Sequence, residues 1–345
     1  MDGSTEDLLT NLSLGVKIAY GIIAGLGIVG NSLVIYVLTH MVRSRKGNAN
    51  ILIVNQSIVD LATSILLVLC FLTPEPSLPS SPIAARFLCS IWNSKYLFWA
   101  TIISSTFNLV CLTLERYFAI VYPFKYRSCT LFKWPKSLML AILPVVVGYL
   151  YQAYFPAMHV VKDGKCVVNQ FASRVAQIVY AIVILLVTYL VPLAIMTFAY
   201  IRIYVVLKTQ SIGNITGEAS HSTDATGNQP HNPNDTNEKA LRNIIKTLLL
   251  VYLLFGLCWA PNEVFYFYFN ISGNQHINET VYNITICLAF FNMCANPFIY
   301  TFKYRRFQEG LQRAMPCLGR LIRVYNTNLS GTQEGKATHV SSPSV

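Results

Sequence analysis

The sequence predicts an all-α integral membrane protein: a seven-transmembrane helix bundle followed by a short amphipathic helix. Of its 345 residues, 54% are hydrophobic and only 12% are charged, about half the roughly 25% charge of an ordinary soluble protein. Seven long stretches contain no charge or a single acid, and a membrane helix needs about 20 mostly apolar residues. This composition excludes a disordered chain and argues against a soluble enzyme.

The seven predicted spans lie between clusters of charged and polar residues. They cover approximately residues 17–42, 47–73, 87–121, 137–161, 174–207, 239–269 and 280–303. Residues 1–16 form the predicted N-terminal segment, and residues 319–345 form a predicted disordered tail. Residues 304–318 are predicted to form an amphipathic helix, because Phe307 and Leu311 recur at helical spacing among arginines.

The placement of basic residues predicts the orientation of the chain, because short loops rich in Lys and Arg stay on the cytoplasmic side. With the loop that carries Arg43, Arg45 and Lys46 inside, the cytoplasmic face holds 20 of the 26 Lys and Arg residues and 7 of the 15 acids. The sequence therefore predicts a multi-pass plasma-membrane protein with an extracellular N-terminus and a cytoplasmic C-terminus. The net charge of +11 then reflects topology and needs no nucleic-acid partner.

Two acids remain inside predicted spans, Asp60 in the second and Glu263 in the sixth. An ionisable group in a span costs about 2.5–3.5 kcal/mol on insertion scales, so each acid needs a partner or a functional role. A proton or ion relay through both acids is one such role, which makes a seven-span transporter the main alternative from another class. The six His are dispersed and no metal-ligand or phosphate-loop motif occurs, so no catalytic residue is predicted.

Of the nine cysteines, only Cys89 and Cys166 fall on the predicted extracellular, oxidising side. Near Cys166, Asp163-Gly164 stands between two short runs rich in β-branched residues, which predicts a hairpin with a two-residue turn. The simplest interpretation is a disulfide between Cys89 and Cys166. The alternative is a plain loop that contains a free thiol.

A set of short motifs recurs in order along the predicted spans. They are Gly30-Asn31 in the first span, Asn55-Gln56-Ser57-Ile58-Val59-Asp60-Leu61 in the second, Glu115-Arg116-Tyr117 in the third, Pro192 and Tyr200 in the fifth, Phe255 and Cys258-Trp259-Ala260-Pro261 in the sixth, and Asn292, Cys294 and Asn296-Pro297-Phe298-Ile299-Tyr300 in the seventh. This ordered set resembles the rhodopsin-like (class A) G protein-coupled receptors, and most of all the peptide and neuropeptide receptors. The resemblance covers residues 15–317 and implies a receptor that activates a heterotrimeric G protein, with arrestin as a further partner.

The resemblance also implies a switch at the cytoplasmic end. Arg116 is expected to pair with Glu115 at rest and to face the G protein after activation. The other expected members of the switch are Tyr117, Tyr200, Asn296, Pro297 and Tyr300. The expected pivot comprises Phe255, Trp259, Pro261 and Pro192, where each proline removes a backbone hydrogen bond from its helix.

Asp60 has expected companions in the family: Asn31, Ser105, Asn292 and Asn296. Together these side chains are expected to form an oxygen-rich pocket for a sodium ion, or a hydrated hydrogen-bond network that stabilises one conformation. A polar cluster that only packs the helices is the third interpretation.

The residues of the ligand pocket separate the ligand classes. A retinal pigment needs a Lys in the seventh span, where the sequence has Phe290, and amine receptors need an acid in the outer third span, where none occurs. No retinal or other cofactor is expected, and a short peptide is favoured over a non-peptide small molecule. The predicted pocket comprises Lys95, Tyr96, Trp99, Tyr154, Glu263 and Tyr266. Within it, Glu263 either neutralises Lys95 or meets a cationic group of the ligand.

Three smaller expectations complete the prediction. Cys89 and Arg116 are 27 positions apart, two more than the family spacing, which predicts a bulge or a shifted outer end in the third span. Asn11 and Asn278 lie in glycosylation sequons on the predicted outer side. Cys317, at the end of the amphipathic helix beside membrane lipids, is either a palmitoylation site or a free thiol.

Overall fold

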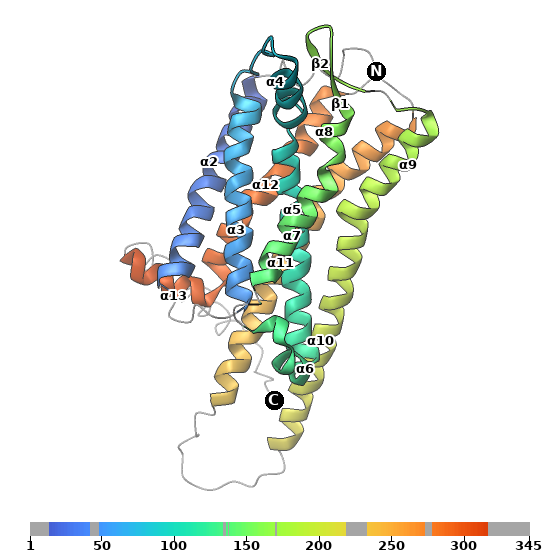
Figure 1. The fold of residues 1–345 in the computed structure, drawn as a ribbon. Helices are drawn as coiled ribbons and strands as arrows, with labels where there is room; N and C mark the ends of the chain where they lie inside the picture. Colours follow the sequence, from blue (N-terminus) through green and yellow to red (C-terminus); the bar gives the residue numbers. More distant parts are fainter. Residues whose placement is uncertain are drawn as a thin grey trace, which may run out of the picture.

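Seven helices of the computed structural model are long and apolar enough to cross a membrane, which confirms the predicted seven-helix bundle. The structure describes residues 14–41, 48–133, 136, 138–169, 171–218, 233–272 and 278–316. The main helices run roughly side by side along the bundle (Figure 1). They are α2 (Leu14–Tyr36), α3 (Asn48–Leu67), α5 (Tyr96–Val121), α7 (Leu138–Gln152), α9 (Arg174–Ile184) continued by α10 (Val191–Glu218), α11 (Pro233–Ser272) and α12 (Glu279–Lys303).

Four short π-helical segments interrupt or extend these helices. They are η1 (Val37–Met41), η2 (Val68–Leu72), η3 (Leu88–Asn93) and η5 (Leu185–Leu190). A π turn places one extra residue in a helical turn and is common at functional sites. Segment η5 joins α9 to α10 directly before Pro192, so the helix changes its geometry where the pivot proline was expected.

The start of the third span shows the predicted irregularity. Helix α4 (Pro82–Phe87) leads into η3, and α5 begins only after Lys95, which has a left-handed backbone with φ of 57°. The π-helical turn and the left-handed residue together accommodate the long spacing between Cys89 and Arg116. The predicted bulge is therefore present, and it changes the direction in which the side chains of Lys95 and Tyr96 point.

A β-hairpin covers one end of the bundle, together with α4 and α8 (Tyr154–Met158) (Figure 1). Strands β1 (His159–Lys162) and β2 (Lys165–Val168) pair antiparallel, with Lys162 opposite Lys165. The two turn residues, Asp163 and Gly164, have φ of 50° and 71°, the positive values that a tight hairpin turn of this twist requires. The predicted hairpin is confirmed, and this end of the molecule is called the hairpin end below.

The predicted disulfide between Cys89 and Cys166 is present, with a Cα–Cα distance of 5.4 Å. It joins η3 to β2 and so fixes the hairpin to the start of the third span. Because 77 residues separate the two cysteines, the bond removes much of the freedom of the unfolded chain.

The opposite end carries Arg116 and is called the Arg116 end. Two short helices, α6 (Pro123–Ser128) and η4 (Thr130–Phe132), follow α5 there, and α13 (Arg305–Ala314) follows α12. Helix α13 buries Phe307 and Leu311 completely, and the Tyr304 hydroxyl before it donates to Asn50 Oδ1 at 2.6 Å. These contacts anchor the predicted amphipathic helix. Cys317 and Asn11 lie outside the described residues.

Close helix packing positions the centre of the bundle. Gly148 on α7 lies against Ser104 on α5, where a Cβ atom would meet the Ser104 backbone nitrogen at 2.7 Å. Ser104 donates to the Ala100 carbonyl at 2.7 Å and lies 3.3 Å from the Val145 carbonyl. Any larger residue than glycine would separate the two helices, so Gly148 sets the position of the side chains that follow it on α7.

Candidate functional site

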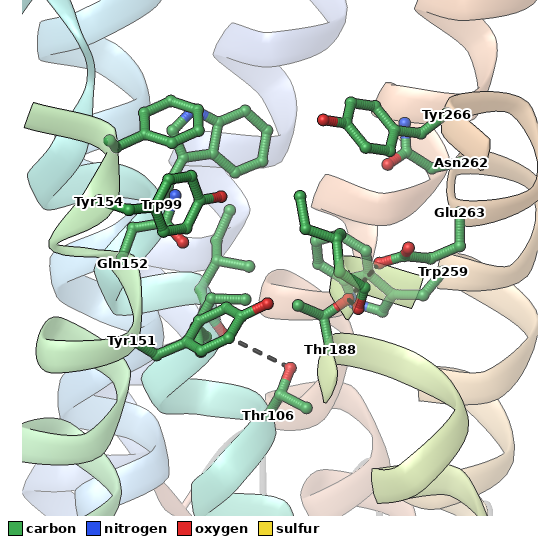
Figure 2. Close-up of a pocket in the computed structure, with 14 residues that line it drawn as sticks. Trp99, Thr106, Tyr151, Gln152, Tyr154, Thr188, Trp259, Asn262, Glu263 and Tyr266 are labelled. Carbon is green, nitrogen blue, oxygen red and sulfur yellow. Dashed lines mark hydrogen bonds between the residues drawn. The ribbon is translucent and has the colours of Figure 1, made fainter. Parts of the chain in front are cut away.

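A cavity of about 130 Å³ lies between the helices on the hairpin side of the bundle. Most of the labelled side chains that surround it are aromatic or amide-bearing, and they point inward from both sides (Figure 2). The lining residues are Trp99, Ile102, Ile103 and Thr106 from α5, Tyr151 and Gln152 from α7, Tyr154 and Phe155 from α8, Ile184 from α9, Thr188 from η5, and Trp259, Asn262, Glu263 and Tyr266 from α11.

Glu263 is the acid that lines this cavity. Its side chain is only 6% exposed, and Thr188 Oγ1 lies 2.9 Å from its Oε1 atom. The same hydroxyl lies 2.8 Å from the Ile184 carbonyl oxygen, and a threonine has a single hydrogen to donate. Among the described residues no cation pairs with Glu263. The carboxylate is therefore buried with one shared neutral donor.

The cavity wall opposite Glu263 is aromatic. Tyr151 and Tyr154 stand on that side (Figure 2), with ring centroids 6.2 Å apart in an edge-to-face arrangement. Tyr154 also meets Tyr180 edge-to-face at 5.2 Å. These contacts hold the rings in place, so the wall is formed before any ligand enters.

Four of the six predicted pocket residues line the cavity: Trp99, Tyr154, Glu263 and Tyr266. Lys95 and Tyr96 do not, because the left-handed break turns both away from it. Lys95 Nζ lies 3.2 Å from Glu75 Oε1 and 4.9 Å from the centre of the Phe71 ring. Tyr96 donates its hydroxyl to the Tyr149 carbonyl at 2.9 Å. The interpretation that Glu263 neutralises Lys95 is wrong.

Sequence reasoning missed five polar residues of the cavity: Thr106, Tyr151, Gln152, Thr188 and Asn262. Gln152 and Asn262 carried a usable signal, since each is an amide in or next to an otherwise apolar span. At the start of β1, His159 has its Nδ1 2.8 Å from the carbonyl oxygen of Phe155, which lines the cavity. Burial lowers the pKa of His159 from its ordinary value, against the opposing effect of that hydrogen bond.

Asp60 occupies a second buried polar site, nearer the centre of the bundle. Its carboxylate is fully buried and accepts hydrogen bonds from three side chains. Gln56 Nε2 lies 3.1 and 3.2 Å from the two oxygens, Ser105 Oγ lies 2.8 Å from Oδ1, and Asn296 Nδ2 lies 2.9 Å from Oδ2. Asn108 Nδ2 donates in turn to Gln56 Oε1 at 2.7 Å.

Two of the expected companions of Asp60 do not bind it. Asn31 instead donates to the Gly27 and Met293 carbonyls at 3.0 and 3.1 Å, because it faces the packed contact with α12. Asn292 lines the small cavity of about 10 Å³ beside Asp60 without a hydrogen bond to it. Asn292 therefore lies in the polar pocket beside Asp60, whereas Asn31 is hydrogen-bonded at the contact between α2 and α12. Gln56, one helical turn before Asp60, takes their place.

Two amide oxygens near Asp60 are free to bind a cation such as sodium. The Oδ1 atoms of Asn292 and Asn296 are buried and accept no hydrogen bond from the described residues, and amide oxygens are suitable ligands for hard cations. Both Asp60 oxygens, however, already face amide hydrogens of Gln56. The residues fit a small cation, with Gln56 as its competitor for the carboxylate.

The switch motif lies at the Arg116 end. Arg116 Nε donates to Glu115, as expected for the pair, and the Tyr126 hydroxyl from α6 donates to the same carboxylate. Tyr200 and Tyr300 are both buried in the hydrophobic core that extends to this end. Tyr117 is partly buried against the same core, its ring 6.0 Å from that of Phe198.

The pivot residues connect the two polar sites. Pro261 and Pro297 lie inside α11 and α12, and Phe255 is buried one turn and a half before Pro261. Trp259 lines both the cavity beside Glu263 and the small cavity beside Asp60. A change in the position of Trp259 would therefore alter the surroundings of both acids.

Of the predicted modification sites, Asn278 is exposed, and its side chain accepts a hydrogen bond from Val281 N at 3.2 Å at the start of α12.

Comparison with known proteins identifies the family. Residues 30–300 match the model of the "7 transmembrane receptor (rhodopsin family)". The chain is 24% identical to the [Phe13]-bombesin receptor of Bombina orientalis over 88% of this chain and 76% of that receptor. It is 25% identical to the pyroglutamylated RF-amide peptide receptor of Rattus norvegicus (90% and 72%) and 26% identical to the octopamine receptor beta-2R of Drosophila melanogaster (67% and 48%). The chain therefore belongs to the rhodopsin family of seven-transmembrane receptors, which are receptors and not enzymes.

Proposed function

We propose that this receptor binds an extracellular peptide at the hairpin end and activates a heterotrimeric G protein at the Arg116 end, from the plasma membrane. The position of Trp259 carries the proposal. Trp259 lines both the cavity that holds Glu263 and the cavity beside Asp60. A ligand that favours one arrangement of this side chain shifts the equilibrium of the bundle, since it binds one state better than the other.

A peptide is favoured over a small amine by two observations. The relatives named for bombesin and for an RF-amide peptide align over most of this chain. The third span has no acid between Phe87 and Leu114, so the usual partner of an amine ligand is missing although an octopamine receptor is among the relatives. The cavity on the hairpin side is lined by aromatic and polar side chains, which suits a chain-like ligand with varied side chains.

G protein coupling is supported by the surface around Arg116. The Glu115–Arg116 pair lies beside α6, whose Phe124 is 86% exposed and is followed by Lys125 and Arg127. An exposed aromatic side chain next to basic residues is a typical anchor for a protein partner. We place this surface in the cytoplasm because of the charge asymmetry of the loops, where arrestin would meet the same face.

The direct test is nucleotide exchange on G proteins in membranes that contain the full-length receptor, screened against a peptide library. We expect at least one peptide to stimulate exchange, and we expect Arg116→Ala to abolish the stimulation at equal surface expression. Arg306→Ala, which removes an exposed charge on α13, is the matched control and should respond like the wild type. A current under voltage clamp without any G protein, and no exchange with any peptide, would favour a transporter instead.

A further inference from the structure

We infer that the ligand carries a cationic group, a guanidinium or an ammonium, which docks between Glu263 and the aromatic wall of the cavity. The inference rests on the proposed function only in that it concerns the same cavity. It adds the chemical class of the ligand group that docks beside Glu263.

First, Glu263 receives few hydrogen bonds for an acid in a membrane bundle. A carboxylate buried in a membrane bundle requires several hydrogen-bond donors or a cation to offset its lost hydration. Glu263 has the Thr188 hydroxyl alone, and that hydroxyl also serves the Ile184 carbonyl. Because Glu263 lines the cavity, a ligand group in the cavity can supply the donors that the protein does not.

The second step is that the described cations near the hairpin end are engaged elsewhere or face solvent. Lys95 pairs with Glu75, and Arg174 donates to the Ile271 carbonyl and to Gln177. Lys162 and Lys165 of the hairpin are exposed and do not line the cavity. No described cation is therefore placed to pair with Glu263, and a cationic ligand group would meet no competitor there.

The third step is the nature of the remaining wall. Trp99, Tyr151, Tyr154 and Tyr266 present aromatic rings to the same cavity, and a cation is attracted to aromatic faces in a desolvated site. Gln152 and Asn262 add amide oxygens that can accept from the several N–H groups of a guanidinium or an ammonium. An acidic ligand group would meet only like charge at Glu263. A purely apolar group would leave the buried carboxylate without a partner.

The test uses matched peptide pairs in the nucleotide-exchange assay. In each pair one peptide keeps Arg, Lys or a free N-terminus, and its partner carries citrulline, acetyl-lysine or an acetylated N-terminus. We expect one neutralising change to reduce potency at least tenfold on the wild type and to make little difference on Glu263→Gln. Glu75→Gln, which removes the acid already paired with Lys95, is the control and should keep the full difference. Neutral or acidic activators, or a difference that survives in Glu263→Gln, would overturn the inference.

A second measurement separates this inference from the peptide proposal. Thermal unfolding of the purified full-length receptor is followed with millimolar arginine amide or with citrulline amide as the probe. We expect arginine amide to raise the unfolding temperature of the wild type and of Glu75→Gln, but not of Glu263→Gln, because ligands that bind only the folded state stabilise it. Equal effects of the two probes on the wild type would overturn the inference even if a peptide activates the receptor. A clear arginine-amide effect with no active peptide would count against the peptide proposal alone.

Discussion

Asp60 and Glu263 are both carboxylates buried inside the helix bundle, but their surroundings differ sharply. Three side chains donate to Asp60, and the adjoining cavity is about 10 Å³. One shared hydroxyl donates to Glu263, and its cavity is about 130 Å³. The exposed fractions, 0% and 6%, do not separate the two acids. The two acids differ in the number of hydrogen-bond donors around them and in the volume of the adjoining cavity.

The difference shows how one bundle can use a buried acid for two purposes. Hydrogen bonds to a charged group contribute about 1.5–3 kcal/mol each, so the donors around Asp60 offset its burial within the protein and couple α3, α5 and α12. Glu263 lacks such compensation, which keeps it receptive to a partner from outside. Trp259 lines both cavities, and the proposed function makes it the side chain that couples them.

The largest expected effect comes from removing the disulfide that attaches the hairpin to η3, on the side of the bundle that holds the Glu263 cavity. In Cys89→Ala/Cys166→Ala, the loss of a bond that closes 77 residues should lower the free energy of unfolding by about 4 kcal/mol. Agonist potency should also fall, because the hairpin is no longer fixed to the start of the third span, whose Trp99 lines the cavity. Thermal unfolding and concentration–response curves provide the measurement. Cys129→Ala, which removes a cysteine outside any disulfide, is the control, and equal behaviour of the two variants would contradict the expectation.

A smaller effect is expected when one donor is removed from Asp60. Ser105→Ala should destabilise the receptor by about 2 kcal/mol, because the hydroxyl donates to a fully buried carboxylate. Ser57→Ala is a matched control on the same helix as Asp60: Ser57 Oγ is buried and has no hydrogen-bond partner among the described residues. Its removal should be neutral or slightly stabilising. If thermal unfolding ranks the two variants the other way, Asp60 is not satisfied by its neighbours.

The smallest expected effect concerns the competition between Gln56 and sodium. Gln56→Leu removes the amide hydrogens that face both Asp60 oxygens, so sodium should bind about tenfold more tightly, a difference of about 1.4 kcal/mol. The measurement is the difference in unfolding temperature between sodium chloride and choline chloride. That difference should be larger in Gln56→Leu than in the wild type and should vanish when Asp60→Asn is added. No salt dependence in either protein would remove sodium from the account.

Much of the fold could be predicted because its signals are local. Charge-free stretches of sufficient length mark the spans, and Asp163-Gly164 marks the hairpin turn. The contact of Arg116 with Glu115 follows from their adjacency. The π-helical segments had no such signal, because an extra residue in a helical turn depends on packing with neighbouring helices.

The site was less predictable because its contacts join distant parts of the chain. Glu75, the partner of Lys95, lies in a loop, and the left-handed backbone at Lys95 is not visible in composition. Gln56 was recoverable, since a glutamine one turn before an acid on a helix faces the same side. The roles assigned to the switch and pivot residues stay predictions.

Concentration–response curves of Glu263→Gln and Asp60→Asn, recorded with one cationic peptide agonist, test most directly whether Glu263 binds the ligand and Asp60 controls the conformation of the bundle. We expect Glu263→Gln to move the curve to at least about tenfold higher concentration, since a charge-assisted contact is lost, and to leave maximal nucleotide exchange unchanged. Asp60→Asn should chiefly change basal or maximal exchange. A lowered maximum at unchanged half-maximal concentration in Glu263→Gln would show that Glu263 acts in the switch and not in ligand binding.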